Sequence, residues 1–561
     1  MYFFRMPAKR AVLLVVLLAV SLPGIAQTPY VEKIEVRVTN VDVIVTDRSG
    51  KPIPGLTKDD FIVLEDGRPQ PITNFYEMRA QQATIAGAAP AQSSEPEAMP
   101  RELRNRRFVF FLDSFSLGME RNGVLTSMRR FVEKQMEPGD EATVVTWNRR
   151  MEIVTPFTSD KSAVLAGFDV LAKRTPSGAS LKAEQYRIMS IAMEDYRNSI
   201  ARRSPRATTA DTSLPAKAIM DKLTGYVTMW ADEVRDTHRA LFQSMHVMLT
   251  SLGGIEGRKV MVYAGSYLPE RPGIEIFQQL SGAVPGFEMF AGSAVNRLKP
   301  QSEEILAVAR HANAVGVTMY TIFPESVDND PGAEGREFQA TVSSSSALQT
   351  LARVTGGTMT AKTWNFDATL QSVASDLTAY YSIGYRSDRD DKPGEHSVAV
   401  KTKNGAYRVR SRKSYVVRSA DEQVGDSVIA NLVHAVPEGD IPITLKVGPP
   451  QPDGRGTYKV MLDVSFPSSG VTALPDGDKV AGGFTIYIAA GTPLGALSPV
   501  SKRTEALRVP AETYNAMVAQ KYPLVLHSQV LIGRGENVLS VGVVDQISST
   551  SGFARAKVTA Q

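Results

Sequence analysis

The sequence predicts an α/β fold in which a doubly wound sheet stands between two β-rich regions. Residues 108–112, Phe-Val-Phe-Phe-Leu, are consecutive apolar residues, a run typical of a strand buried on both faces of a sheet. The strand ends at Asp113. A helix is predicted next, because apolar residues recur at three- and four-residue steps: Leu125, Met128, Val132 and Met136. Strand, polar turn and helix form the unit of an open α/β sheet, which binds ligands at the carboxyl ends of its strands.

Residues 1–26 predict a secretory signal peptide. Arg5, Lys9 and Arg10 precede an apolar stretch over residues 11–22, and small residues lead to a cleavage point after Ala26. We therefore expect a secreted or periplasmic protein. A retained membrane anchor is the alternative, although the apolar stretch is short for a membrane span.

The composition limits the remaining possibilities. Removing 26 of the 561 residues leaves 535, which is enough for about three domains. The chain has no cysteine, which excludes disulfides and thiolate metal sites. A net charge of +4 is too small for this length to indicate a nucleic-acid partner, and no later apolar run predicts a membrane span after signal cleavage.

Residues 30–80 predict an N-terminal β module. Val41, Val43 and Val45 alternate with polar residues, and residues 61–64 form a further apolar strand before a turn. Residues 82–104 are rich in Ala, Gly, Pro, Ser and Gln, a composition that predicts a flexible linker.

Residues 105–420 carry the alternation of strands and helices. Strands are predicted at residues 142–147, 259–263 and 317–323, with residues 151–154 as a hairpin partner of the first. Asp160 predicts the cap of a helix that runs to about Leu171. Further helices are predicted at 302–315, 347–354 and 366–377, then a last core strand at 379–385 and a hairpin at 396–417. Glycines in Thr355-Gly-Gly357 would end the second of these helices.

A helical insertion is predicted at residues 183–250, between the second and third core strands. Two apolar stripes with helical spacing flank a loop over residues 202–215. We expect the stripes to pack on each other or on the sheet, and a partner-binding arm is the alternative. From residue 425 to 561, short alternating strands separated by glycine-containing turns predict a β-sandwich of immunoglobulin type.

Residues 105–385 resemble a von Willebrand factor A domain. The resemblance is carried by Phe108–Ser116, Ala142–Ser159 and Gly257–Ser266. The segments Thr355–Gly357 and Tyr380–Tyr385 are similar to those of a bacterial exported subfamily that adds flanking β modules. The resemblance implies a doubly wound fold with a binding face at the strand ends.

The resemblance also implies a metal-ion-dependent adhesion site, which this chain retains only in part. The family pattern is Asp-x-Ser-x-Ser in the first loop, Thr in the second and Asp in the third. Asp113 matches the first position and would be the metal ligand. The other positions differ, with Phe115 and Leu117 for the serines, Ala179 for the threonine, and Ala264-Gly-Ser266 where the last carboxylate is expected. We expect Mg²⁺ to bind weakly or not at all, with Asp113 capping its turn instead.

No other motif predicts chemistry. The six histidines are scattered and none lies in a His-Glu-x-x-His pattern, and no Gly-x-Ser-x-Gly or phosphate loop occurs. We expect a non-enzymatic, exported protein-binding module of adhesion type, without a cofactor, whose partner is a protein or another envelope component. Its contact residues would lie on the strand-end rim: Asp113, Ser114, Ser116, Ser180, Ser266 and Tyr267. A magnesium-dependent adhesin and a hydrolase whose residues meet only in the fold are the alternatives.

Overall fold

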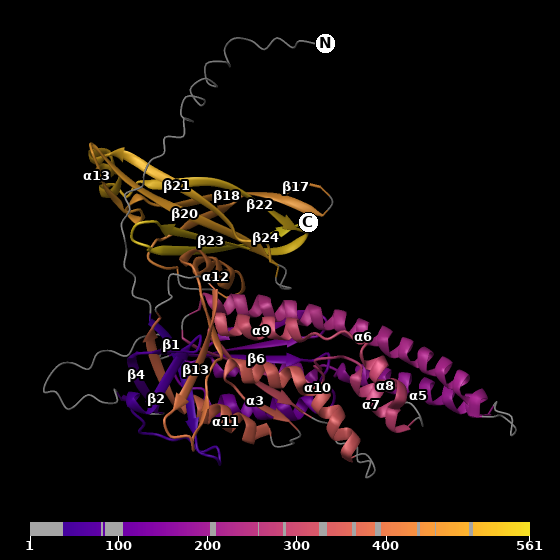
Figure 1. Ribbon diagram of the computed structural model, residues 1–561. Helices are drawn as coiled ribbons and strands as arrows, with labels where there is room; N and C mark the ends of the chain where they lie inside the picture. Colours follow the sequence, from indigo (N-terminus) through magenta and orange to yellow (C-terminus); the bar gives the residue numbers. More distant parts are fainter. Residues whose placement is uncertain are drawn as a thin grey trace, which may run out of the picture.

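The computed structural model describes residues 38–79, 82–84, 105–201, 209–255, 257–283, 288–324, 334–361, 366–387, 394–434, 438–454, 456–492 and 497–561. The predicted signal peptide and most of the predicted linker lie outside these ranges. The chain folds into an α/β region, a β region split between two parts of the sequence, and a C-terminal β region (Figure 1).

The α/β region is built on a six-stranded sheet with the order β11-β10-β9-β6-β7-β8. All neighbours are parallel except β7 and β8, which form the predicted hairpin. The strands are β6 (Arg106–Asp113), β7 (Glu141–Trp147), β8 (Met151–Thr158), β9 (Arg258–Ala264), β10 (Val317–Phe323) and β11 (Met359–Ala361).

Helices cover both faces of this sheet, as a doubly wound fold requires. The helices of the α/β region are α3 (Arg121–Gln135), α4 (Lys161–Lys173), α5 (Gly178–Ala201), α6 (Thr209–Gly253), α7 (Ile274–Ala283), α8 (Glu288–Val295), α9 (Ser302–Ala314), α10 (Glu334–Thr355) and α11 (Phe366–Thr378). Phe108 and Phe110 pack with α3, α4 and α11 on one face. Val109 and Phe111 pack with α6, α9 and α10 on the other. The apolar run of β6 is thus buried on both faces, as predicted.

The helical insertion consists of α5 and α6, which follow β7 and β8 and precede β9. The far ends of both helices extend well beyond the sheet (Figure 1). Their apolar stripes form a separate core with α7 that includes Leu223, Trp230 and Phe277. We call this pair of helices the arm.

The split β region corrects one prediction about the central sheet. Residues 379–385 do not form its last strand, because β12 (Ala379–Arg386) pairs on both sides with strands from the start of the chain. The two sheets of this region have the orders β14-β1-β12-β4-β5 and β15-β13-β2-β3. Their strands are β1 (Val38–Thr46), β2 (Phe61–Glu65), β3 (Arg68–Gln70), β4 (Ile72–Arg79), β5 (Gln82–Thr84), β13 (Gly394–Thr402), β14 (Arg408–Arg410) and β15 (Ser414–Val417).

The reason for the difference is that an apolar run predicts burial without identifying the neighbouring strands. Val43, Phe61 and Ile383 share one core, so residues 38–84 and 379–417 fold together and the α/β region is inserted between them. Residues 82–84, predicted as linker, pair with β4 as β5.

The C-terminal β region packs two antiparallel sheets around a common core. Helix α12 (Ala420–Val433) lies between these sheets and α6, and so joins the C-terminal β region to the α/β region (Figure 1). The remaining elements are β16 (Thr444–Val447), β17 (Gln451–Pro452), β18 (Thr457–Pro467), β19 (Ala473–Asp476), β20 (Lys479–Gly491), β21 (Ser501–Pro510), α13 (Ala511–Ala519), β22 (Pro523–Gly533), β23 (Gly535–Asp545) and β24 (Ser551–Ala560).

No helix in the part of the chain that the structure describes is both long enough and apolar enough to cross a membrane.

Candidate functional site

Asp113 ends β6 at the carboxyl edge of the sheet, where the fold places a binding site. Its side chain is buried, with 1% of its surface exposed. One carboxylate oxygen accepts the backbone N–H groups of Phe115 and Ser116, each at 3.2 Å. The other accepts the Ser116 hydroxyl at 2.6 Å and the Tyr263 hydroxyl at 3.1 Å. The protein itself therefore supplies four hydrogen bonds to this carboxylate.

Burial has a stronger effect on the protonation of Asp113 than these donors do. Desolvation raises the pKa of Asp113 to about 6, although the Ser116 and Tyr263 hydrogen bonds act in the opposite direction. Burial also raises the pKa of Tyr263, and the neighbouring Asp113 charge adds to that rise. The Tyr263 hydroxyl is thus a stable hydrogen-bond donor to Asp113.

A second carboxylate, Glu120, closes the other side of the rim. It is buried, and one of its oxygens accepts the Gly118 N–H at 2.9 Å and the Ser266 hydroxyl at 2.6 Å. The Ser266 N–H in turn donates to the Ser116 hydroxyl at 3.0 Å. The first and third loops are therefore joined by one continuous hydrogen-bonded chain from Asp113 to Glu120.

The sequence interpretation missed both Glu120 and Tyr263. Glu120 lies outside the family spacing, and its only signal is a carboxylate two residues after Gly118. Tyr263 lies within an apolar strand, so its sequence context predicted a core residue. Only the parallel pairing of β6 with β9 brings its hydroxyl to Asp113.

Ser114 and Tyr267 also have partners inside the protein. The hydroxyls of Ser114 and Thr146 lie 2.7 Å apart and tie the end of β6 to β7. The Tyr267 hydroxyl donates to Glu275 at 2.5 Å, and Gln185 of α5 donates to the same oxygen at 3.0 Å. Burial raises the pKa of Glu275 to about 7. Tyr267 therefore belongs to the core of the arm.

Four of the residues predicted to contact a partner, Asp113, Ser114, Ser116 and Tyr267, are buried in this structure. Ser266 is partly exposed. The Ser180 side chain lies outside the described residues, while its backbone is part of α5. The structure brings Asp113, Ser116 and Ser266 together, and it places Ser114 and Tyr267 in separate hydrogen-bonded groups.

The arm is the physical reason for this burial. The Gly178 N–H at the start of α5 donates to the Leu117 carbonyl at 3.0 Å. A Cβ atom at Gly178 would lie 2.2 Å from the Ser116 carbonyl oxygen, so only glycine permits this approach. The first residue of α5 thus packs directly on the first loop.

Exposed apolar side chains occur in the first loop and on the arm. Met119 in the first loop is 80% exposed, and Tyr186 and Met229 on the arm are 60% and 68% exposed. Arg149, exposed in the turn between β7 and β8, places its guanidinium 5.2 Å from the centre of the Phe115 ring.

The residues at Asp113 do not fit the metal ion that the family resemblance implies. Mg²⁺ requires about six oxygen ligands in octahedral geometry. Here hydroxyl and N–H donors occupy both oxygens of Asp113, and Glu120 is likewise directed at donors. Within the described ranges, no three His, Asp or Glu residues lie close enough together to hold a metal ion.

The condition for a hydrolase is a histidine within hydrogen-bond reach of Ser114 or Ser116. The side chains of these serines bond to Thr146, Asp113 and the Ser266 backbone. Among the described residues, no hydrogen bond joins either serine to a histidine.

Comparison with known proteins gives structural likenesses only. No protein-family model matches the chain, and no curated protein matches it. A von Willebrand factor type A protein from Catenulispora acidiphila is 9% identical, with 90% of this chain and 74% of that chain covered at a TM-score of 0.22. The von Willebrand factor domain of the type V pilus tip protein Mfa5 from Porphyromonas gingivalis is 14% identical, with 49% and 94% covered at 0.19. The protein BatB from Bacteroides thetaiotaomicron is 8% identical, with 49% and 96% covered at 0.20. These similarities are to bacterial proteins, two of them described as von Willebrand factor proteins, and each TM-score is 0.22 or lower.

Proposed function

We propose that this chain is an exported, non-enzymatic protein-binding module of adhesion type that binds its partner without a metal ion. The observation that carries the proposal is the hydrogen bonding of Asp113. Four internal donors satisfy the carboxylate that a metal-dependent adhesin would use as a ligand. A metal ion would have to displace these donors, which makes direct protein contacts the simpler means of binding.

The contact surface we propose is the exposed edge around the covered site rather than the buried residues themselves. It comprises Met119 of the first loop together with Tyr186 and Met229 of the arm. Methionine and tyrosine are enriched at protein interfaces, where they supply large contact areas. Tyr186 and Met229 belong to α5 and α6, the two helices whose far ends extend beyond the sheet (Figure 1).

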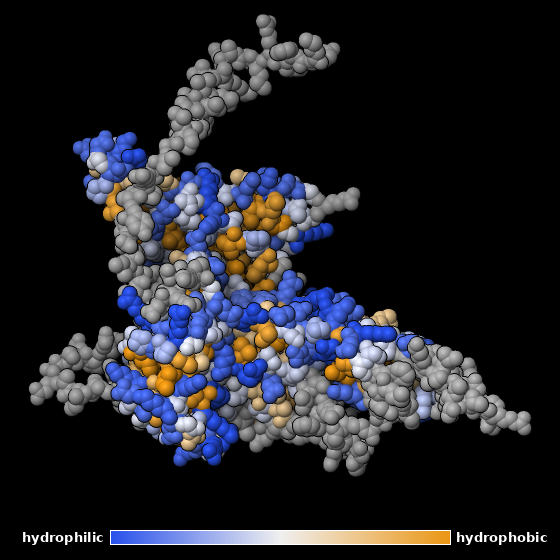
Figure 2. All heavy atoms as spheres, viewed as in Figure 1, coloured by the Kyte–Doolittle hydropathy of each residue, from blue (hydrophilic) through white to orange (hydrophobic). Residues whose placement is uncertain are grey.

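The two flanking β regions would then hold the α/β region in place. We propose that the C-terminal one is an immunoglobulin-type sandwich. Hydrophobic residues also reach the surface there, as Figure 2 shows for the face in view. Met461 of β18 and Leu531 of β22 are 46% and 56% exposed. The exposed residues of the C-terminal β region are the alternative location for the interface. Substitution of one of them therefore serves as the control.

The experiment is capture of a partner from the native envelope on the immobilised full chain, followed by measurement of its affinity. We expect the double substitution Tyr186→Ala and Met229→Ala to weaken binding by about 1 kcal/mol or more, as truncation of interface anchors does. Met461→Ala, which removes a similar exposed side chain from the C-terminal β region, should leave the affinity unchanged.

The same measurement with a chelator distinguishes the alternatives. We expect equal affinity with and without chelator. Loss of binding on chelation would favour the magnesium-dependent adhesin, and loss with Met461→Ala alone would move the interface to the C-terminal β region. Turnover of the captured partner would favour the hydrolase.

A further inference from the structure

A second polar site lies at the opposite edge of the central sheet. A cavity of about 220 Å³ is enclosed there by the split β region and the amino-terminal ends of β9 and β10. Arg258 and Val317 are the first residues of those strands. Asn40 and Gly316 are exposed at the mouth, whereas Ser382 and Ser411 in the walls are buried.

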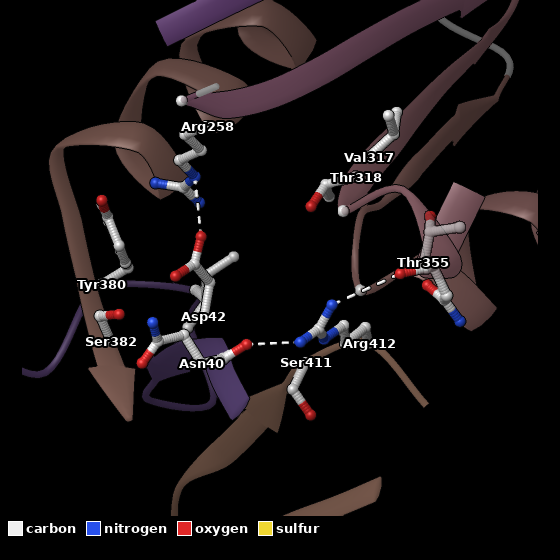
Figure 3. Close-up of a pocket in the computed structure, with 15 residues that line it drawn as sticks. Asn40, Asp42, Arg258, Val317, Thr318, Thr355, Tyr380, Ser382, Ser411 and Arg412 are labelled. Atoms are coloured by element: carbon white, nitrogen blue, oxygen red, sulfur yellow. Dashed lines mark hydrogen bonds and ion pairs between the residues drawn. The ribbon is translucent and has the colours of Figure 1, made fainter. Parts of the chain in front are cut away.

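Two arginines and one aspartate give this cavity its charge. Arg258 has only 7% of its side chain exposed, and its Nε lies 3.2 Å from the Asp42 carboxylate. The Arg258 guanidinium also stacks over the Tyr380 ring at 3.8 Å. Arg412 enters from another side of the cavity (Figure 3). The lining therefore contains two positive charges and one negative charge, a net charge of +1.

Arg412 is the arginine of this cavity that contacts no carboxylate of the described residues directly. Its terminal nitrogens donate to the backbone carbonyls of Asn40 and Asn313. Among the described residues it forms no ion pair, and its Nε–H is a buried donor without a partner. Burial lowers the pKa of Arg412, although the negative charge of nearby Asp42 acts in the opposite direction.

Hydroxyl groups extend the set of donors around Arg412. The buried Ser411 hydroxyl also lacks a hydrogen-bond partner. Thr318 directs its hydroxyl toward the space between the two arginines (Figure 3). A buried donor without a partner is costly, so the free Nε–H of Arg412 favours an acceptor in the cavity.

The Thr355-Gly-Gly357 motif builds the wall that holds Arg412. Gly356 has φ +85°. A Cβ atom there would lie 2.7 Å from the Ser411 carbonyl carbon and 2.8 Å from the Arg412 nitrogen. A Cβ atom at Gly357 would lie 2.0 Å from the Met319 carbonyl oxygen. Both glycines thus allow α10 to pack closely between β10 and the Arg412 loop.

We propose that this cavity is a binding site for a small oxyanion, either a carboxylate or a phosphate group, held by Arg412 and Arg258 with the Thr318 hydroxyl. The arginine guanidinium presents paired donors that match both groups. The volume is below the range of pockets for drug-sized ligands, so a small anion or one terminal group of a larger molecule fits. This site is independent of the proposed partner surface, which lies at the other edge of the sheet.

The test is calorimetric titration of the full chain with inorganic phosphate and, separately, with acetate, at constant ionic strength set with chloride. We expect at least one of the two to bind with a Kd of about 1 mM or lower. Arg412→Met should weaken that affinity at least about tenfold. Arg239→Met provides the matched control, because Arg239 is an exposed arginine of α6 paired with Asp236, and it should leave the affinity unchanged.

Thr318→Val keeps the test decisive if Arg412→Met does not fold, because it removes one hydroxyl and preserves the shape of the side chain. We expect it to weaken binding about threefold. Binding of phosphate alone or of acetate alone would each support the site and identify the class of anion. Absence of binding of both anions up to about 10 mM, or equal affinities in the wild type and all variants, would overturn the proposal.

Discussion

The two edges of the central sheet differ in how their buried polar groups are satisfied. At the carboxyl edge, Asp113 accepts four hydrogen bonds and Glu120 closes the loop beside it. At the amino edge, the Arg412 Nε and the Ser411 hydroxyl are buried without partners. The carboxylate at the edge that the fold class marks for binding is thus satisfied within the protein, while the arginine at the opposite edge retains an unused donor.

This difference shows that the position of a residue in a fold does not determine its present role. Asp113 keeps its place at the end of β6, but its surroundings make it a structural acceptor. Gly178 at the start of the arm packs against the backbone of Ser116 and Leu117 in the loop that follows Asp113, and Tyr263 donates a hydrogen bond to Asp113 from β9. Four predictions test the contrast between the edges, from the largest expected effect to the smallest.

Substitution of Asp113 by alanine should destabilise the α/β region by about 3 kcal/mol or more. The change removes the carboxylate acceptor of the buried Ser116 and Tyr263 hydroxyls, whereas the Phe115 and Ser116 N–H groups keep the backbone carbonyls of Trp147 and residue 113 as acceptors. All three tryptophans, Trp147, Trp230 and Trp364, lie in the sequence between β6 and β12, so fluorescence during urea unfolding reports on this region. A ligand carboxylate kept for a metal would give the opposite result, since its removal would cost little stability in metal-free buffer.

The stability of Asp113→Asn relative to the wild type should rise as the pH increases from about 4 to about 6. The folded wild type holds a proton on Asp113 up to a pKa of about 6, whereas the unfolded chain releases it near the ordinary value of 3.8. The unfolded state therefore binds fewer protons in this window, and wild-type stability falls with rising pH, by up to about 1.4 kcal/mol per pH unit. The asparagine variant has no such titration.

Urea unfolding of both proteins at several pH values measures this difference. Buried histidines such as His238, whose pKa falls to about 4 on burial, contribute the opposite slope in both proteins and cancel. A constant difference across the window would mean that Asp113 titrates like an exposed carboxyl group.

Gly178→Val should cost about 1–3 kcal/mol and loosen the cover over the carboxyl edge. The added side chain would meet the Ser116 carbonyl, and relief requires α5 to move away from the first loop. Hydrogen exchange should then increase at the amides of Phe115 and Ser116.

Gly225→Ala in α6 is the matched control within the same arm. An added Cβ meets nothing within 4 Å there, so this substitution should stabilise the helix by about 0.5–1 kcal/mol. If Gly178→Val and Gly225→Ala behave alike, contact between the arm and the rim is not what seals Asp113.

The elements of the α/β region could be predicted from the sequence because their signals are local. Five apolar residues identified β6, and the Asp160 carboxylate caps α4 by accepting the Ser162 N–H as expected. The neighbours of β12 could not be predicted, since its partners β1 and β4 lie about 300 residues earlier in the chain. Strand β11 was missed because three residues carry no periodic signal.

The sequence predicted where the candidate site lies, but it did not predict the hydrogen-bond partners and the burial of its residues. Asp113 was placed at the strand end correctly, because that depends only on where the apolar run stops. Its partner Tyr263 is 150 residues away. The burial of Tyr267 depends on how the arm folds back onto α7. The cavity around Arg412 combines six separate segments, none of which carries a binding motif by itself.

The smallest expected effect concerns magnesium at the carboxyl edge. Binding to the native state alone stabilises it by RT ln(1 + [L]/Kd), which is about 0.4 kcal/mol when the ion is present at its Kd. If Mg²⁺ must displace the four donors to Asp113, its Kd lies far above physiological concentrations, and about 1 mM Mg²⁺ should not change the Tm. Phosphate or acetate at the amino edge should raise the Tm under the same ionic strength.

The measurement that tests this is a pair of melting curves, with and without Mg²⁺, for the wild type and for Asp113→Asn, which keeps the side-chain shape. A rise in Tm with Mg²⁺ that Asp113→Asn abolishes would show that the carboxyl edge still binds metal, and the contrast between the two edges would then fail.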